Sequence, residues 1–410
     1  MRTIGLSLLV ILFGCSSTKK LEQKNSATSN QTVKSVATSV NQFSLSLYET
    51  LSEPGENLFY SPYSISLAMN MAYLGSAGET ETEFQKALYF GSNNTTYHQL
   101  VKQLNDSLTQ NKESENTINI ANAFWLQEAF NLEEAYQKNI KNFYDGAVNY
   151  ADFKEPASRE TARKEVNKWV EDKTNEKIEN LIGQGVLDDN TRMILVNAIY
   201  FFGKWQSPFI PGKNEDKPFS NADGTESNTT FMQKDLTLPY YENENLQAVS
   251  LPYEEDEFSM VVLMKKDPEA NGSYASLLNF ETVNELLSNP TNELIHLELP
   301  KFKLEEQYDL VAAFKEMGMQ EAFGMEANFS GMREKNDLNI SNIIHKAFVE
   351  VNEEGTEAAA ATGVVMSLKM ANMPPDKSFI VDRPFVFFIR HNNTGAILFF
   401  GEVNQLKESR

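Results

Sequence analysis

Residues 353–369 read Glu353-Glu354-Gly355-Thr356-Glu357-Ala358-Ala359-Ala360-Ala361-Thr362-Gly363-Val364-Val365-Met366-Ser367-Leu368-Lys369 and follow a strand-like segment, residues 347–351. The run begins with small residues, becomes apolar and contains no proline. If it forms a strand, alternate side chains share one face. The side chains on the face of Thr356 are then all uncharged: Ala358, Ala360, Thr362, Val364 and Met366.

The composition of this segment does not decide its conformation. Alanine favours a helix, and an Ala-rich stretch also suits a flexible surface linker. Gly355 and Gly363 lower helix stability, and the β-branched Thr362, Val364 and Val365 favour strands. A strand-capable segment and a linker therefore both stay open from the pattern alone.

Strand signals surround the segment. Strands are predicted by the apolar or alternating runs 193–202, 258–264 and 294–299, and a hairpin by the runs 384–389 and 396–400 around Asn392-Asn393-Thr394-Gly395. All of these runs except 193–202 lie in the second half of the chain, where strand signals dominate.

Helical periodicity is clearest after Pro156 and Ser158. Apolar residues fall near one face among charged neighbours at Val166, Trp169, Val170, Ile178, Leu181 and Ile182. Helices dominate the first half of the chain and strands the second. We therefore expect an α+β fold with segregated elements rather than regular βαβ alternation.

The composition excludes several classes of function. The chain has 410 residues, with 36 Lys and Arg against 57 Asp and Glu, and a formal net charge of −21. No basic stripe occurs, so no nucleic-acid partner is expected. The single cysteine, Cys15, excludes an intramolecular disulfide. Four scattered histidines, His98, His296, His345 and His391, are too few for a metal cluster, so neither a metal nor a cofactor is expected.

The N-terminus resembles a bacterial lipoprotein signal. Residues 4–13 are almost wholly apolar but too few to span a bilayer, and Cys15 follows them closely. In a lipobox the cysteine becomes the lipidated first residue, so we expect a signal peptide over residues 1–14. The chain is then extracytoplasmic and lipid-anchored to a bacterial membrane, at the outer membrane or cell surface, with secretion as the alternative. Residues 15–38 are predicted to be a flexible tether and residues 39–407 a single domain.

No catalytic motif stands out. The chain lacks His-Glu-x-x-His, Gly-x-Ser-x-Gly and a phosphate-binding glycine loop. Ser-x-x-Lys, a spacing found in penicillin-recognising hydrolases, occurs at Ser16/Lys19 and Ser17/Lys20, within the predicted tether. A lipoprotein hydrolase of that class is disfavoured, and the chain is not expected to be an enzyme.

Five segments resemble the signatures of one family, in the family's order. They are Asn57-Leu58-Phe59-Tyr60-Ser61-Pro62-Tyr63-Ser64-Ile65-Ser66, Leu74-Gly75-Ser76-Ala77-Gly78 with Thr80, Leu195-Val196-Asn197-Ala198-Ile199-Tyr200-Phe201-Phe202-Gly203-Lys204-Trp205, residues 353–362, and Asp382-Arg383-Pro384-Phe385-Val386-Phe387. On these segments the chain resembles a serpin, a member of a family of serine protease inhibitors, from about residue 40 to residue 404. Residues 353–362 resemble the proximal hinge of the family's reactive-centre loop.

The resemblance implies a serpin fold of three β-sheets and eight or nine helices, with an exposed reactive-centre loop at about residues 353–376. A serine protease cleaves this loop and is held as a covalent acyl-enzyme while the cut loop inserts into the central sheet. The native state is then metastable, and Gly355 is expected to permit the sharp swing that starts insertion. A monomer liable to loop–sheet polymerisation is expected. The alternative is a non-inhibitory serpin, acting as a binding protein or a plain protease substrate.

The family's usual spacing also implies a reactive bond. Fourteen positions after the hinge glycine lies Lys369, followed by Met370. Lysine there implies a trypsin-like target, whose acidic pocket binds a cation. The stretch up to Pro384 is longer than in several members, and alignment from that side shifts the bond towards Met370 or Ala371. Such a shift would indicate elastase-like, chymotrypsin-like, subtilisin-like or cysteine proteases.

The other carried-over residues have structural roles, and none is catalytic. The hinge comprises Glu353, Gly355, Thr356, Ala358, Ala359, Ala360, Ala361 and Thr362. The shutter, a polar network beneath the sheet, comprises Ser61, Ser64, Asn197 and His345, and the breach, where insertion begins, contains Trp205. Lys301 is expected to form a salt bridge with Glu353.

Overall fold

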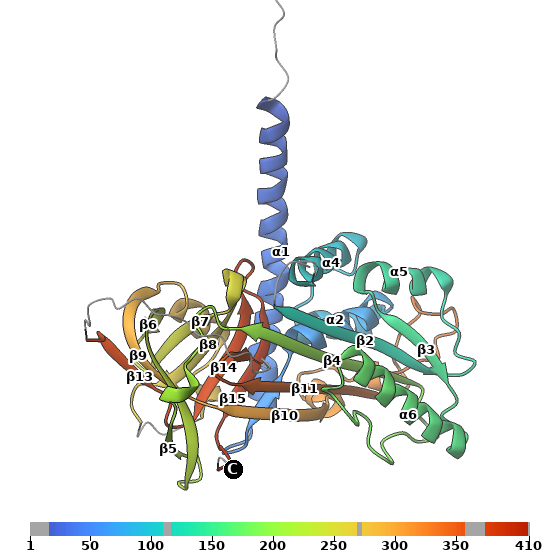
Figure 1. Cartoon of the computed structure of the whole chain (residues 1–410). Helices are drawn as coiled ribbons and strands as arrows, with labels where there is room; N and C mark the ends of the chain where they lie inside the picture. Colours follow the sequence, from blue (N-terminus) through green and yellow to red (C-terminus); the bar gives the residue numbers. More distant parts are fainter. Residues whose placement is uncertain (1–15, 110–115, 269–272, 357–373, 409–410) are drawn as a thin grey trace, which may run out of the picture.

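The computed structural model describes residues 16–109, 116–268, 273–356 and 374–408. These residues form eight α-helices and fifteen strands, and hydrogen bonds join the strands into two sheets. Helices and strands are segregated along the chain as predicted, so the expected α+β class is confirmed (Figure 1).

The six-stranded sheet has the order β10-β11-β12-β4-β2-β3. Its strands are β2 (Thr117–Gln127), β3 (Ala147–Ala151), β4 (Met193–Lys204), β10 (Phe302–Asp309), β11 (Asn342–Val351) and β12 (Gly355–Thr356). Strand β4 is central: it pairs antiparallel with β2 and parallel with β11. Its apolar run reflects burial on both faces of the sheet.

The nine-stranded sheet has two limbs that share one long strand. Its strands are β1 (Leu58–Tyr60), β5 (Glu215–Ser220), β6 (Glu226–Glu242), β7 (Leu246–Pro252), β8 (Phe258–Lys265), β9 (Thr291–Pro300), β13 (Lys377–Ile380), β14 (Phe385–His391) and β15 (Ile397–Val403). Strand β6 pairs with β5 and β9 over most of its length and with β7 at its end. The three expected sheets are thus the six-stranded sheet and these two limbs, β5-β6-β9-β13 and β6-β7-β8-β14-β15-β1.

Helices cover both faces of the six-stranded sheet (Figure 1). The helices after the first are α2 (Pro62–Leu74), α3 (Gly78–Leu88), α4 (Thr95–Thr109), α5 (Glu134–Tyr144), α6 (Pro156–Lys173), α7 (Phe280–Leu286) and α8 (Val311–Glu316). Short 3-10 turns lie at Pro211–Lys213, Glu254–Asp256, Tyr274–Ser276 and Glu321–Phe323. Helix α2 is buried along nearly its whole length in the larger core, and α6 closes a second apolar cluster on the opposite face.

Helix α6 is shorter than its periodicity predicts. It ends at Lys173, and Asn175 and Glu176 follow with φ of 53° and 61°. Two consecutive residues with left-handed backbone stop a right-handed helix. Ile178, Leu181 and Ile182 are still fully buried, but from the loop that follows the helix. The helix predicted from the spacing of these three residues is therefore wrong.

Helix α1 (Ser16–Leu51) projects from the body in Figure 1 and differs from the expected tether. Its side chains pack on the core from Val33 onward, with Val36, Ala37 and Val40 also buried. These positions follow the three- and four-residue spacing of one helical face, which the polar composition around them conceals. The packed body therefore begins before residue 39. No helix in the described ranges is long and apolar enough to cross a membrane.

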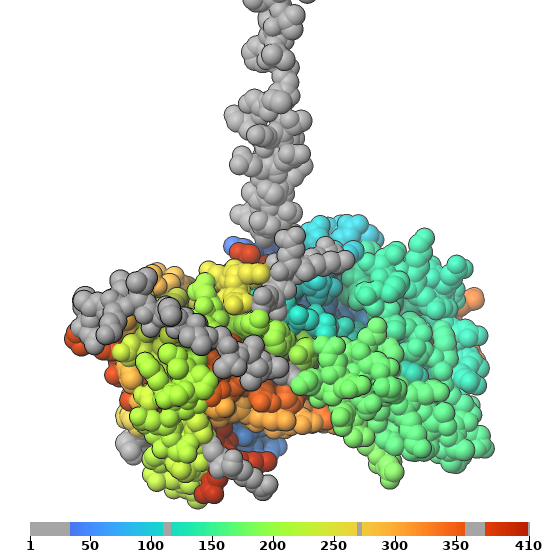
Figure 2. Space-filling view, viewed as in Figure 1, coloured from blue at the N-terminus to red at the C-terminus, as the bar shows by residue number. Residues whose placement is uncertain are grey.

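The two ends of the molecule are built from different parts of the chain. In Figure 2, α5 and α6 with their connections form the surface at one end, and β5, β6 and the red β13 lie at the other. The six-stranded sheet joins the two ends (Figure 1).

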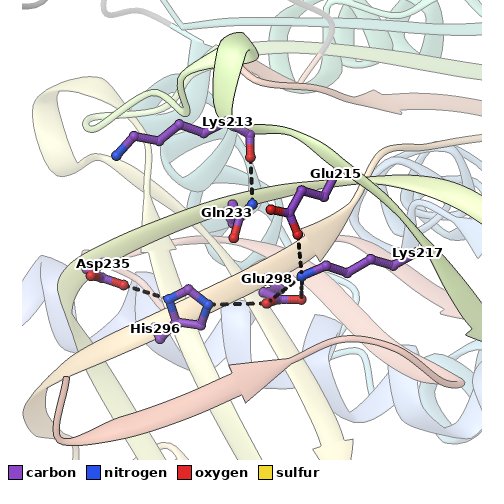
Figure 3. Close-up of polar contacts among 7 residues, drawn as sticks. All are labelled: Lys213, Glu215, Lys217, Gln233, Asp235, His296 and Glu298. Carbon is purple, nitrogen blue, oxygen red and sulfur yellow. Dashed lines mark hydrogen bonds and ion pairs between the residues drawn. The ribbon is translucent and has the colours of Figure 1, made fainter. Parts of the chain in front are cut away.

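A row of alternating charges crosses the β5-β6-β9 strands (Figure 3). His296 Nδ1 lies 2.6 Å from Asp235, its cross-strand partner, and Nε2 lies 3.2 Å from Glu298. Lys217 contacts Glu298 at 2.8 Å and Glu215 at 3.1 Å. The hydrogen bond to Asp235, aided by Glu298, outweighs partial burial and raises the pKa of His296 above 6.5. The protonated imidazole thus contributes a positive charge between the carboxylates of Asp235 and Glu298.

This arrangement predicts a pH effect on stability above pH 6.5. Because the pKa of His296 is raised in the folded chain, its stabilisation is full below pH 6.5 and is lost as pH rises through the raised value. We expect the thermal midpoint to fall by about 1–3 °C over that range, since partly exposed ion pairs contribute little. His296→Gln should remove this component when midpoints are compared by scanning fluorimetry. An identical decline in the variant would contradict the assignment.

Candidate functional site

The chain reverses at the end of β11 and returns into the sheet as β12. Strand β11 pairs with β4 from Asn342–Ile194 to Ala347–Ile199. If this register continued, Val351 would lie opposite Gly203. Instead Thr356 lies between these two residues and pairs with both. The first residues of the predicted reactive-centre loop therefore already occupy a position between two strands of the sheet.

Gly355 is required here by close packing. It pairs with Lys204, and a Cβ on Gly355 would lie 2.0 Å from the carbonyl oxygen of Gly203. Its φ is not among the positive values that favour glycine. In this structure the need for glycine is steric, because a side chain at residue 355 would force the backbones of β4 and β12 apart. The expected role in a swing during insertion stays a prediction.

Trp205 and Phe209 hold the turn that leads into β12. The backbone N–H of Trp205 donates to the carbonyl of Glu354 at 2.8 Å, and the indole N–H donates to Asn352 at 3.0 Å. The backbone N–H of Phe209 donates to the carbonyl of Glu353 at 2.8 Å. Three successive carbonyls of the turn are therefore bound by one segment. Trp205, predicted as a breach residue, lies directly at the point where β12 enters the sheet.

Thr356 is buried in contact with the aromatic pair behind the turn. Its side chain is 1% exposed, and its hydroxyl lies 2.6 Å from the hydroxyl of Tyr253. The Tyr253 ring stacks on Trp205 with centroids 4.6 Å apart. Thr356, the residue from which an inserting strand would continue, is thus already buried and hydrogen-bonded to Tyr253.

Glu353 joins the turn to two neighbouring segments. Lys301 lies 3.1 Å from its carboxylate, so the structure contains the expected salt bridge, and Asn214 donates to it at 2.5 Å. Burial opposes ionisation of Glu353, but its backbone N–H, Asn214 and Lys301 together hold the pKa of the carboxyl below its usual value. The negative charge therefore persists at neutral pH and keeps the turn attached to Lys301.

The four predicted shutter residues meet beneath β4 and β11. His345 Nε2 accepts from the backbone N–H of Ser61 at 3.0 Å, so Nδ1 carries the proton and donates to Asn197 at 2.5 Å. The Asn197 amide nitrogen lies 2.9 Å from the carbonyl of Ser64 and 2.5 Å from its hydroxyl. The Ser61 hydroxyl caps α2 and donates to the carbonyl of Leu398 at 2.6 Å. The network therefore ties α2 and β15 to the two central strands.

Complete burial keeps His345 neutral. It lowers the pKa of the imidazole from 6.5 to about 3. The neutral ring is also what the geometry requires, because Nε2 must accept while Nδ1 donates. His345 therefore acts as a fixed hydrogen-bond relay between Ser61 and Asn197.

Four residues join these networks although the sequence had not singled them out. Asn352 and Asn214 hold the hinge, Tyr253 lies behind Thr356, and Asn122 accepts from Asn197 at 2.5 Å. Asn352 carried a usable signal, because Asn-Glu-Glu-Gly has asparagine first and glycine fourth, as type I turns favour. The other three depend on contacts distant in sequence.

Several predicted site residues cannot be placed. Cys15, the hinge residues Ala358, Ala359, Ala360, Ala361 and Thr362, and the reactive-bond candidates Lys369, Met370 and Ala371 lie outside the described residues. Among the residues that the structure does describe, no group of three or more His, Cys, Asp or Glu side chains could hold a metal ion.

Known proteins resemble this chain in sequence along most of its length. The family model for serpins, serine protease inhibitors, matches residues 38–406. Leukocyte elastase inhibitor A of Mus musculus is 37% identical over 372 residues, covering 88% of this chain and 97% of its own. An uncharacterised serpin-like protein of Methanosarcina mazei is 35% identical over 419 residues, covering 97% and 95% of the two chains.

A solved structure shows the same fold. Serpin48 of the insect Tenebrio molitor, described as a highly specific serpin, superposes with a TM-score of 0.81 at 33% identity. The match covers 91% of this chain and 98% of that one. With the family model spanning nearly all of the chain beyond residue 37, and with the hinge turn seated in the sheet, this chain belongs to the serpin family.

Proposed function

We propose that the chain is an inhibitory serpin, a suicide-substrate inhibitor of serine proteases. The observation that carries the proposal is the seating of β12 between β11 and β4, because it starts an additional strand in the register that insertion would extend. In the reaction, the protease's serine oxygen bonds to the carbonyl carbon of the residue before the scissile bond. The peptide C–N bond breaks, and the proton passes to the new amino group.

The register predicts where each loop residue would go. Thr356 lies between Val351 and Gly203, so each further loop residue would lie one position earlier on both neighbouring strands. Continued over the length of β4, this antiparallel register places residue 366 opposite Met193, the first residue of that strand. Residues 355–366 therefore match β4 in length.

The side chains of the loop suit that path. Thr356 faces the larger core, so residues 358, 360, 362, 364 and 366 would face it too. All five are uncharged, and two are alanines. An inserting strand of this kind meets the packed core without burying a charge on that face. The pattern that left strand and linker open in the sequence therefore supports a strand here.

Insertion must also part the shutter. His345 and Asn197 are direct partners in the β11–β4 register. The extended register would place Thr362 between them and break the hydrogen bond from His345 Nδ1. The Thr362 hydroxyl arrives beside the separated polar groups, where it is able to replace a lost contact. The closed network therefore opposes insertion until the loop is cut.

The energetic balance favours the inserted state. A dozen new backbone hydrogen bonds, at about 0.5–1.5 kcal/mol each, contribute on the order of 10 kcal/mol. Burial of Val364 and Met366 adds about 1.5–3 kcal/mol each. This total is comparable with the stability of a whole domain. The uncleaved chain is therefore proposed to be metastable, and one molecule's loop is able to enter another's sheet.

We assign the reactive bond to Lys369–Met370 and the target to trypsin-like proteases. The relative from Mus musculus is named an elastase inhibitor, which supports the alternative bonds that begin at Met370 or Ala371. The chain's net charge of −21 would favour encounter with a basic protease. Both assignments name the same mechanism and differ in the residue that enters the protease's specificity pocket.

We further propose that Cys15 is the lipidated first residue of an extracytoplasmic, membrane-anchored chain. Support comes from the apolar run that precedes this single cysteine. In the structure α1 begins at Ser16 and leads directly into the packed body at Val33. Residues 16–32 would then separate the inhibitor from the membrane surface.

Incubation with trypsin, elastase, chymotrypsin and subtilisin tests the proposed function. We expect an adduct with trypsin that survives SDS electrophoresis, together with a released fragment whose first residue is Met370 by mass spectrometry. A fragment starting at Ala371 or beyond, formed with elastase, would move the reactive bond but retain the mechanism. Cleavage by all four enzymes without any stable adduct would show that the chain is merely a substrate.

Thr356→Arg should convert the inhibitor into a substrate. Arginine would place an unpaired charge beside Tyr253 in a position that is now 1% exposed, so insertion would begin poorly. We expect the adduct yield to fall by at least about tenfold while the cleavage site is unchanged. Thr356→Ser, which keeps the hydroxyl and the small volume, is the matched control and should trap normally. Retained inhibition by the arginine variant would count against insertion as the trapping step.

A further inference from the structure

The turn between β11 and β12 is closed by the side chain of its first residue. The backbone N–H of Asn352 donates to the carbonyl of Gly355 at 3.0 Å. The Asn352 Oδ1 atom accepts from the backbone N–H of Glu354 at 3.0 Å and of Gly355 at 3.3 Å. An asparagine side chain that bonds the backbone two residues on mimics a further turn and stabilises the reversal.

Asn352 is also bound from outside the turn. Its carbonyl accepts from the indole N–H of Trp205, and the next two carbonyls accept from Phe209 and Trp205. The side chain of Asn352 accepts hydrogen bonds from backbone N–H groups within the turn. The segment that contains Trp205 and Phe209 donates hydrogen bonds to the carbonyls of the turn. One residue thus links the internal geometry of the turn to its position against β4.

The same local device occurs elsewhere in the chain. In the hairpin between β6 and β7, the backbone N–H of Asn243 donates to the carbonyl of Leu246 at 3.0 Å. Its Oδ1 accepts from the N–H groups of Asn245 and Leu246 at 2.9 and 2.8 Å. This second turn joins β6 to β7, whereas β12 pairs with β11 and β4. It therefore separates the general effect of losing such a turn from an effect specific to the hinge.

We propose that Asn352 is a positioning residue for loop insertion, and that its side chain sets the turn from which the inserting strand grows. The inference rests on the proposed inhibitory function. Insertion extends β12 one residue at a time from Thr356, so its first steps need the preceding turn to be already formed. If the turn is open, the cut loop must rebuild it before any pair beyond Thr356 forms, and the acyl-enzyme has more time to hydrolyse.

We expect the variant to change the partition of the acyl-enzyme between trapping and hydrolysis. In Asn352→Ala the protease should still cleave the loop at the wild-type rate, because the scissile bond lies well beyond the turn. The number of inhibitor molecules cleaved per protease trapped should rise by about five- to tenfold, and tenfold corresponds to about 1.4 kcal/mol. Asn352→Asp, which keeps the acceptor oxygen, should restore trapping, and Asn243→Ala should trap like the wild type.

Hydrogen exchange supplies a readout that does not depend on trapping. In the uncleaved chain, the peptide covering residues 352–356 should exchange faster in Asn352→Ala than in the wild type or in Asn352→Asp. Exchange in β3, at the opposite edge of the six-stranded sheet, should be unchanged. Faster exchange throughout the variant would show general destabilisation and would overturn the local role.

The outcomes separate the two proposals. If the wild type traps and Asn352→Ala traps equally well, the positioning role is wrong while the inhibitory function stands. Failure of Asn352→Asp to restore trapping would also overturn the role, because the acceptor oxygen would then not be the determinant. If the wild type traps none of the four proteases, the proposed function fails and the inference fails with it.

Discussion

The parting of β4 and β11 beyond the Ala347–Ile199 pair is the constraint on which the site depends. Past this pair both strands continue, to Lys204 and Val351, and their facing backbone groups need partners. Thr356 occupies the position between Val351 and Gly203. Of the described residues, Gly355 and Thr356 of β12 occupy this part of the sheet, and the proposed insertion would continue the same strand from them.

Two sets of interactions hold this arrangement, one at the hinge turn and one within the β4–β11 pairing. At the hinge, the turn carbonyls are bound by Trp205 and Phe209, and Glu353 is held by Lys301. Below it, His345 and Asn197 keep the two strands together. Both sets consist of hydrogen bonds and an ion pair. Hydrogen bonds of this kind are exchanged for equivalent ones without unfolding the surrounding core, which is what the proposed insertion would require.

Much of the fold could be predicted from the sequence. The apolar runs at 193–202 and 258–264 correspond to β4 and β8, and the two runs around Asn392–Gly395 form the β14–β15 hairpin. These predictions succeeded because buried strands require apolar side chains. The helical periodicity gave a wrong prediction after α6, because Asn175 and Glu176 have positive φ and end the helix. It also missed the start of the packed part of α1, where a narrow apolar stripe lies within a polar composition.

Some residues of the site could also be predicted from the sequence, and others could not. Family resemblance selected Trp205, His345, Asn197 and Glu353, and the structure brings them to the hinge and the shutter. Asn352 was readable locally as the first residue of a turn. Tyr253, Asn214 and Asn122 reach the site only through strand register and tertiary packing, which a single sequence does not specify.

The steric role of Gly355 likewise depends on the approach of β12 to Gly203, a contact that no local pattern encodes.

The most direct test of the central claim is the thermal stability of the chain before and after a single cut within residues 363–371. If the cut loop inserts beside β4, new hydrogen bonds worth on the order of 10 kcal/mol form. The midpoint of unfolding should then rise by on the order of 10 °C or more. A cleaved chain that unfolds at the same temperature as the intact one would contradict insertion, and with it the proposed inhibitory mechanism.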